Sequence, residues 1–514
     1  MPLGSGRCAA CSGTGCAGAS LKESSCSVTQ TLTVSSPAGG NGPAQIYSVA
    51  PDLGGGPSLP GLGFLGDMLM GARTVHGPSG ELRFAVPLFQ VTGFGPGFDA
   101  DFRLFYRSVF ATSGAGADSH AVREVDGIMD KRPFGPGFRP FWGDKIYSLN
   151  GQQEVIAPSS SQGAVVYRVD CFGTLMSYTM GVGGVSSAGG RGDRLVFTNS
   201  TWYRELPDRT LVEYGSVDSS TERYIEKVFW IPSTDISSIP GTWPLIVDYV
   251  YDTVATGGPV GLTEIQATRN MVFKFTWGEQ DTGKWRVEKI HLERSTMSSA
   301  EKTSAATNYA ITFDYDTSSE ARLTSMGRPP RDFLDDCNQD KSYGTWESFT
   351  AIRPTLVFGW DGSGRLSTIS KKSGTNTATL ITNTYANTWR ISTQAENGAT
   401  GSHSFTYNDV STPPVVTWTD SVGIPTDIEC FKMGSSTSHT KWFPSEVERK
   451  TRVSGNPRGS SYGVHSSLTW SLTWSSAARG NLTELIMPSG RKWQWSYDSS
   501  GRGLVSDIVV HDDS

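Results

Sequence analysis

Apolar and polar residues alternate with a period of two in short stretches along most of this chain. In Phe273–Trp277, Phe358–Trp360 and Trp493–Tyr497 one side of the pattern is aromatic, while residues such as Lys274 and Gln494 fall on the other. Alternation places successive side chains on opposite faces of a β-strand, and no helical period would align these aromatics. The stretches are therefore predicted to be strands of an antiparallel sheet with one aromatic face.

A recurring phrase follows many of these strands: an aromatic residue, an Asp or small residue, and then Gly-Arg-Leu. The two best copies place Gly364–Leu366 after Trp360 and Gly501–Leu504 after Tyr497, the second with an extra Gly. Asp accepts hydrogen bonds from backbone amides two residues on, and Gly adopts a positive φ without a Cβ penalty. The phrase thus predicts a hairpin loop of about three to five residues, after which Leu begins the return strand.

The turn aromatics recur at a nearly constant interval. Trp360, Tyr385 and Tyr407 are 25 and 22 residues apart, and Trp474 and Tyr497 are 23 apart. This interval accommodates two strands and two turns, and such a unit must join its neighbours edge to edge to bury its aromatic face. An ordinary β-sandwich is the alternative, since its strands also recur at short intervals. The residues predicted to build the repeats are Phe313, Tyr315, Asp316, Phe358, Trp360, Asp361, Gly364, Arg365, Leu366, Trp495, Tyr497, Asp498, Gly501 and Arg502.

These units resemble the tyrosine-aspartate (YD) repeats of bacterial Rhs proteins, toxin-complex C components and teneurins. The similarity rests on the copies around Trp360 and Tyr497 and on weaker copies across residues 216–514. Gly80–Ser108 and Phe134–Leu149 are similar to the segment with which such shells begin. The resemblance implies an all-β fold in which a long antiparallel sheet of hairpin repeats curls into an open shell or cocoon.

The resemblance also implies a function. Shells of this family enclose a variable C-terminal effector, often a toxin, so we expect a non-enzymatic structural role whose partner is the remainder of the same polypeptide. The self-cleaving aspartyl segment found in many members has no match here, so no catalytic residue and no cofactor is carried over. The alternative is a cell-surface adhesin that binds a glycan or protein receptor. A third hypothesis, a polysaccharide-degrading enzyme, has no supporting constellation of residues.

Composition and charge limit the possible fold, partners and location of the protein. The 59 Gly and 27 Pro among 514 residues fit many turns and few helices. The net charge of −6, without a basic stripe, argues against nucleic acid as the main partner. No run of 18 apolar residues predicts a transmembrane helix, and residues 1–7 lack the apolar core of a signal peptide. An extracellular or surface location would need an export signal outside this sequence, and we interpret the chain as a fragment of a larger protein.

The chain divides by composition into three parts. Residues 1–60 form a Cys-, Gly- and Ser-rich leader or linker, residues 61–215 the opening segment of the shell, and residues 216–514 the degenerate repeats. Inserts are expected near 327–350 and 422–463, where the repeat pattern is interrupted.

Three interpretations stay open for the cysteines of the leader. Cys8 and Cys11 have the spacing that lets two thiolates bind one zinc ion, with Cys16 and Cys26 as further ligands. The same four residues could instead form disulfides in an oxidising compartment, or have no structural role. Three dispersed cysteines are expected to be small buried residues: Cys171, Cys337 and Cys430.

For two short motifs we favour an interpretation without function. Arg191–Asp193 is the Arg-Gly-Asp tripeptide of integrin ligands, and a match of three residues is easily accidental. Gly459–Gly463 fits the nucleophile-elbow pattern, but no helical pattern follows it, so a plain loop is predicted.

Overall fold

The fold is all-β, and one antiparallel sheet contains 27 of the 31 strands that the structure describes. The computed structural model describes residues 31–33, 74–77, 79–95, 98–111, 132–152, 154–171, 175–186, 193–206, 210–217, 221–230, 243–256, 258–267, 271–327, 355–373, 375–387, 389–397, 401–411, 413–433, 441–450, 467–474, 482–497 and 505–511. Helix α3 (Ser299–Asn308) begins with a capping box made by Ser298 and Glu301. No helix in these ranges is long and apolar enough to cross a membrane.

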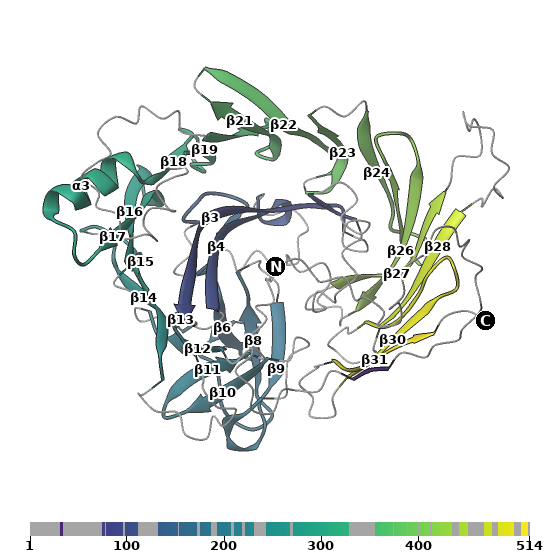
Figure 1. Ribbon diagram of the computed structural model, residues 1–514, viewed down its shortest axis with the longest axis horizontal. Coiled ribbons are helices and arrows are strands. Elements are labelled where there is room, and N and C mark those ends of the chain that lie inside the picture. The colour runs from purple at the N-terminus through teal and green to yellow at the C-terminus, as the bar shows by residue number, and fades with distance from the viewer. Residues whose placement is uncertain are drawn as a thin grey trace, which may run out of the picture.

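The repeats form the long part of the sheet. From β10 to β31 every strand pairs antiparallel with the next strand in sequence. These strands are β10 (Arg194–Thr198), β11 (Thr201–Glu205), β12 (Thr210–Gly215), β13 (Arg223–Trp230), β14 (Leu245–Thr253), β15 (Val260–Ala267), β16 (Met271–Asp281), β17 (Lys284–Arg294), β18 (Ile311–Tyr315), β19 (Leu323–Gly327), β20 (Thr355–Trp360), β21 (Leu366–Ser373), β22 (Asn376–Tyr385), β23 (Ile391–Glu396), β24 (Ser402–Asn408), β25 (Val415–Thr419), β26 (Pro425–Met433), β27 (Lys441–Lys450), β28 (Ser467–Trp474), β29 (Leu482–Ile486), β30 (Lys492–Tyr497) and β31 (Val505–His511). The sheet bends into an open shell (Figure 1).

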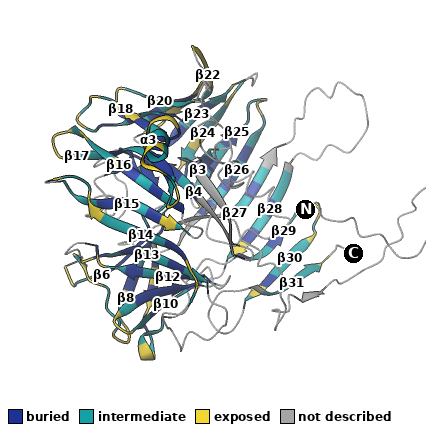
Figure 2. Cartoon of the chain, turned by 60° about the vertical axis from the view of Figure 1, so that its left-hand side comes forward, coloured by how far each residue is buried: buried dark blue, intermediate teal, exposed yellow. Residues whose placement is uncertain are grey.

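A second, four-stranded sheet lies inside the curve of the first. It consists of β2 (Val75–His76), β3 (Glu81–Gly95), β4 (Phe98–Arg107) and β5 (Phe138–Pro140), and we call it the inner sheet. Figure 1 shows the long sheet passing around β3 and β4. Buried residues run through the middle of the strands, and exposed residues gather at their turns (Figure 2). The core therefore lies between the inner sheet and the concave face of the repeats.

A branch closes one end of the long sheet. Strands β6 (Lys145–Leu149), β8 (Val165–Val169) and β9 (Leu175–Thr179) pair in that order, and β6 also pairs with β7 (Val155–Ile156) and β13. Isolated bridges, Met180 with Ser186 and Val185 with Val196, connect the end of β9 to β10. Strands β6, β8 and β9 thus form a ring with β10–β13, which we call the terminal ring. It extends to Trp230, past residue 215 where the sequence placed the end of the opening segment.

The range 422–463 differs from the insert that the sequence predicts. Strands β26 and β27 occupy much of it and pair through eight registered positions from Thr426 to Met433. They belong to the sheet because Ile428, Cys430 and Val447 are buried in one apolar cluster. Of the predicted insert 327–350 the structure describes Gly327, the last residue of β19, and of the leader it describes Thr31–Thr33, which form β1.

Candidate functional site: the concave face of the sheet

Most turn aromatics of the repeats lie at β-bulges. A register shift comes immediately before the aromatic in most hairpins, and a bulge of this kind bends the strand and re-aims the side chain. The aromatic positions that follow a shift are Tyr214, Tyr251, Trp277, Tyr315, Trp360, Tyr385, Trp474 and Tyr497. The bulge is therefore a part of the repeat, although the sequence pattern alone does not predict it.

Most turn aromatics donate a hydrogen bond to a backbone carbonyl of the preceding repeat. The Trp360 Nε1 donates to the Leu323 carbonyl oxygen at 2.9 Å, and Leu323 pairs across the ladder with Tyr315. Tyr385 in turn donates to the carbonyl of Leu366, which pairs with Trp360. The other donor and acceptor pairs are Tyr251 with Ile225, Trp277 with Leu262, Tyr315 with Val287, Tyr407 with Ile391, and Tyr497 with Leu482. We call this series the aromatic seam.

Burial keeps the seam hydroxyls protonated. It raises the pKa of Tyr251 and Tyr315 well above the usual value, and that of Tyr497 to about 12. Desolvation of the phenolate is the first cause in each case. Each of these hydroxyls is consequently protonated at physiological pH and can donate its hydrogen bond.

The Asp of the repeat phrase organises its turn. Asp361 Oδ1 accepts hydrogen bonds from the backbone amides of Ser363 at 2.9 Å and Arg365 at 3.0 Å. Gly364 lies between them with a φ of 75°. The Asp316 turn has the same arrangement, with Oδ1 accepting from the amides of Ser318 and Arg322. These carboxylates serve the backbone of their own loops.

The Arg of the phrase connects one repeat to the next. Arg365 donates from Nε to Asp361 at 2.7 Å, and its guanidinium lies 4.9 Å from the centre of the Tyr385 ring in the following repeat. Arg322 lies 3.7 Å from the Asp316 carboxylate. Asp and Arg therefore hold turns and neighbouring rings in place.

Several predicted residues lie outside the described part of the chain, among them Cys337, Gly459–Gly463 and two larger sets. The two sets are the last turn, Asp498, Gly501 and Arg502, and the leader cysteines, Cys8, Cys11, Cys16 and Cys26. Zinc or disulfides at the cysteines stay predictions. The strand before the last turn is described, and in it Trp495 is buried and stacks on Trp493 with ring centres 6.3 Å apart.

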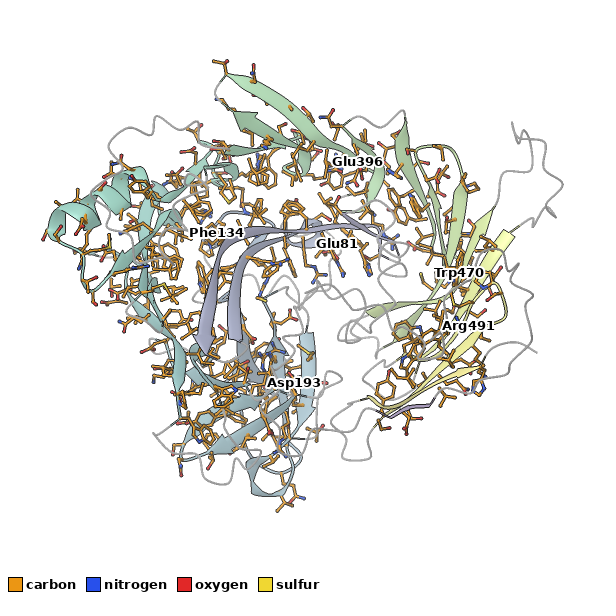
Figure 3. All side chains as sticks on the ribbon, in the orientation of Figure 1. Glu81, Phe134, Asp193, Glu396, Trp470 and Arg491 are labelled. Atoms are coloured by element: carbon orange, nitrogen blue, oxygen red, sulfur yellow. The ribbon has the colours of Figure 1, made fainter. Side chains whose placement is uncertain are left out.

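The concave face of the repeats holds the inner sheet by aromatic contacts. Phe358 meets Phe138 of β5 with ring centres 5.1 Å apart, and Trp360 meets Tyr106 of β4 at 6.3 Å. Similar contacts join Phe313 to Phe134 and Phe275 to Trp142. Side chains fill the space between β3–β4 and the surrounding strands (Figure 3). The aromatic face that the sequence predicts is thus used to bind the opening segment of the same chain.

Polar contacts fix the inner sheet against β23. The Gly80 carbonyl accepts from the Ile391 amide at 2.9 Å, and Ser108 Oγ donates to the Trp389 carbonyl at 2.7 Å. Gln394 Nε2 donates to Thr74 Oγ1 at 2.7 Å. Since these residues are some 300 positions apart along the chain, sequence reasoning had no signal for them.

Glu81 is the buried charge at this junction. Its side chain is 2% exposed and accepts from Arg83 at 2.6 Å and from Arg107 at 2.7 Å. Burial alone would raise the pKa of Glu81, but Arg107 and Arg83 together lower it to about 2. The carboxylate is therefore charged and ties β3 to β4.

A second buried ionic group lies inside the terminal ring. Asp144 accepts from Arg168 Nη2 at 2.6 Å, from Arg204 Nη1 at 3.0 Å and from the Tyr214 hydroxyl at 2.9 Å. All of these side chains are less than a tenth exposed. Buried charges persist only when they are paired and hydrogen-bonded, so this group fixes how the branch meets β11 and β12.

Asp193 belongs to the same ionic group. It accepts from the Tyr178 hydroxyl at 3.0 Å and from Arg168 Nη1 at 3.4 Å, and it is 3% exposed. Figure 3 labels it among the strands of the terminal ring. The acidic residue of the Arg-Gly-Asp tripeptide therefore points inward, and the chance match is the better interpretation of that motif.

The described cysteines are not activated thiols. Burial raises the pKa of Cys430 to about 12 and that of Cys171 further, and both are free. A reactive cysteine needs a lowered pKa. Within the described ranges, no group of three or more His, Cys, Asp or Glu is placed to hold a metal ion.

Comparison with known proteins gives distant structural likenesses. No protein-family model and no curated protein matches the chain. A crystal structure of TcdB2-TccC3 without its hypervariable C-terminal region aligns with 72% of this chain at 9% identity and a TM-score of 0.32. A structure of TcdB2-TccC3 aligns with 78% of this chain at 12% identity and a TM-score of 0.28. The chain spans about a fifth of the length of each of these two structures, 19% and 21%. The N-terminal domain of the effector SpvB from Salmonella typhimurium strain LT2 aligns with 63% of this chain at 12% identity and a TM-score of 0.20. At these scores the likenesses carry no argument about function.

Proposed function

We propose that this chain is a non-enzymatic part of a β-shell in a secreted or surface protein of the Rhs type, and that the shell encloses or presents a C-terminal effector. The observation that carries the proposal is the inner sheet, which lies inside the curve of the repeats. There the concave face already binds polypeptide, with contacts such as Phe138 to Phe358 at 5.1 Å.

The physical basis of containment is a wall whose strands are paired with one another. Between β10 and β31 each strand has both neighbours in sequence as ladder partners, so the wall offers few free edges to an enclosed chain. The aromatic seam adds one side-chain hydrogen bond between most successive repeats. The effector would be a later part of the same polypeptide, and the proposal needs no cofactor and no nucleic acid.

The test is limited proteolysis of the natural full-length polypeptide, including any residues that follow Ser514. If the shell contains them, those residues resist protease in the wild type. Phe358→Asp places a charge in the buried face, where Phe358 is 2% exposed, and we expect it to open the shell and expose them. Val410→Ser is the matched control because Val410 is 93% exposed.

Equal cleavage of the downstream residues in the wild type and in Phe358→Asp would contradict containment. The adhesin alternative then makes its own prediction, which is saturable binding of the intact protein to cells or to a glycan array.

A further inference from the structure

The terminal ring contains a buried lysine. Lys145 begins β6, is 3% exposed, and is the one lysine among the described residues that is buried. Its Nζ lies 2.7 Å from Glu222 Oε1, and the two side chains are 4% and 9% exposed. Lysine is rarely buried unless it is paired, so this contact is a specific feature of the ring.

The contact lies where the two strands share a short ladder. Among the described residues, β6 pairs with β13 through two register positions, Ile146 with Arg223 and Lys145 with Tyr224. Glu222 comes immediately before β13, and it is 77 positions from Lys145 in sequence. A covalent bond between Lys145 and Glu222 would therefore join β6 to β13 where few backbone hydrogen bonds do so.

A lysine and a carboxylate can react, whereas the other buried ion pairs cannot. Among the described residues, the other pairs whose two side chains are both less than a tenth exposed join Arg168 or Arg204 to Asp144 or Asp193. A guanidinium stays protonated in proteins, so it is not a nucleophile. A buried lysine loses its proton more readily, and a proton that passes from an ammonium to a carboxylate in contact with it leaves a neutral amine beside a neutral acid.

We propose that Lys145 and Glu222 form an intramolecular isopeptide bond, an amide between their side chains. The neutral Lys145 Nζ attacks the Glu222 Cδ, and the Tyr224 hydroxyl, which donates to Oε2, stabilises the negative charge that develops on that oxygen. Oε1 holds the transferred proton, takes a second proton from the nitrogen and leaves as water. The Cδ–Oε1 bond breaks and the Nζ–Cδ bond forms, and the step needs no other reactant.

The geometry favours this step because the reacting groups are held in contact. Nζ touches one oxygen of the carboxyl group, so the carbon that it attacks is one bond further away. Holding two groups in this way replaces a bimolecular collision, with effective molarities on the order of 10⁵–10⁸ M for well-oriented pairs. Burial of both side chains keeps bulk water, which would hydrolyse the amide, away from the site. The inference does not rest on containment, because the bond would hold the terminal ring whatever the shell encloses.

The experiment uses the full chain, denatured and reduced before intact mass spectrometry. We expect the wild type to be lighter than its sequence by the mass of one water, because an amide survives denaturation and an ion pair does not. Proteolysis followed by tandem mass spectrometry should identify a branched peptide that joins Lys145 to Glu222. A wild type without this branched peptide, or a water loss that maps to another site, overturns the proposal.

Lys145→Arg separates the covalent bond from the ion pair. Arginine can still pair with Glu222 but cannot form the amide, so we expect this variant to show no water loss and no branched peptide. Lys227→Arg is the matched control, because Lys227 contacts Glu213 at 3.1 Å with its side chain 31% exposed. It should keep the full water loss of the wild type. A water loss that persists in Lys145→Arg, or one that disappears in Lys227→Arg, contradicts the proposal.

Discussion

The Tyr251 hydroxyl donates a hydrogen bond of 2.7 Å to the carbonyl oxygen of Ile225, the residue that pairs across the ladder with Tyr214. Tyr214 is the turn aromatic of the preceding hairpin, so the contact joins the bulge of one repeat to the return strand β13 of the repeat before it. The same relation recurs along the aromatic seam. Successive hairpins are consequently held both by their ladders and by a side chain that bonds to the neighbouring strand.

Tyr251→Phe tests the seam. The change removes one hydroxyl from a buried site and leaves the ring, so we expect the free energy of unfolding to fall by about 1 kcal/mol, with an unpaired Ile225 carbonyl adding to the loss. Urea denaturation followed by tryptophan fluorescence measures it. Val410→Ala, at a position 93% exposed, should leave the midpoint unchanged. A variant as stable as the wild type would show that the seam does not contribute to stability.

Gly364→Val tests the turn. Gly364 has a φ of 75°, and a Cβ there would lie 2.9 Å from an Arg322 guanidinium nitrogen. A β-branched residue in this conformation costs roughly 1–3 kcal/mol, so we expect a lower melting temperature. Gly362→Ala in the same loop is the matched control, because nothing lies within 4 Å of its Cβ position. Identical melting temperatures for both variants would refute the argument from backbone strain.

Asp144→Ala tests the buried ionic group of the terminal ring. Its loss leaves the buried guanidinium groups of Arg168 and Arg204 without their closest carboxylate, and breaking a buried pair in this way costs about 3–5 kcal/mol. Glu320→Ala removes the partner of Arg132 at a site 38% exposed and should cost at most about 1 kcal/mol. Chemical denaturation measures the free energy of unfolding of both variants. Similar losses of stability in the two variants would mean that burial of an ion pair does not determine the cost of breaking it.

Glu81 predicts an acid-dependent loss of stability. Its pKa is lowered in the folded protein to about 2 from an ordinary value of 4.5, so the carboxylate stabilises the fold above pH 4.5. That contribution decreases as the pH falls from about 4.5 towards 2. We expect Glu81→Gln to have a lower free energy of unfolding than the wild type at pH 7. This difference in free energy should shrink steadily as the pH falls from about 4.5 towards 2. Urea midpoints measured between pH 7 and pH 2 check it, and a difference independent of pH would rule out the ion pairs as its source.

Local chemistry determined the repeat unit from the sequence. The alternation of Phe358 and Trp360 gave a strand with an aromatic face, and Asp361 with Gly364 gave the loop. These features need only residues within a few positions of one another, so a period or a turn signature reveals them. The same patterns predicted a continuous antiparallel sheet, and the resemblance to YD repeats implied an all-β fold in which that sheet forms an open shell. The structure confirms this fold class.

The tertiary structure decided what the repeats contact. Ile225 as the acceptor of Tyr251, Phe138 as the partner of Phe358, and the inward position of Asp193 all join parts of the chain that have no common sequence pattern. Strands β26 and β27 belong to the sheet where an insert was expected. The interval between turn aromatics is interrupted there, but Ile428 and Val447 are buried in the apolar cluster and hold both strands in place. Hydrophobic periodicity specifies that a face is to be buried, whereas the partner that buries it depends on the curvature of the whole sheet.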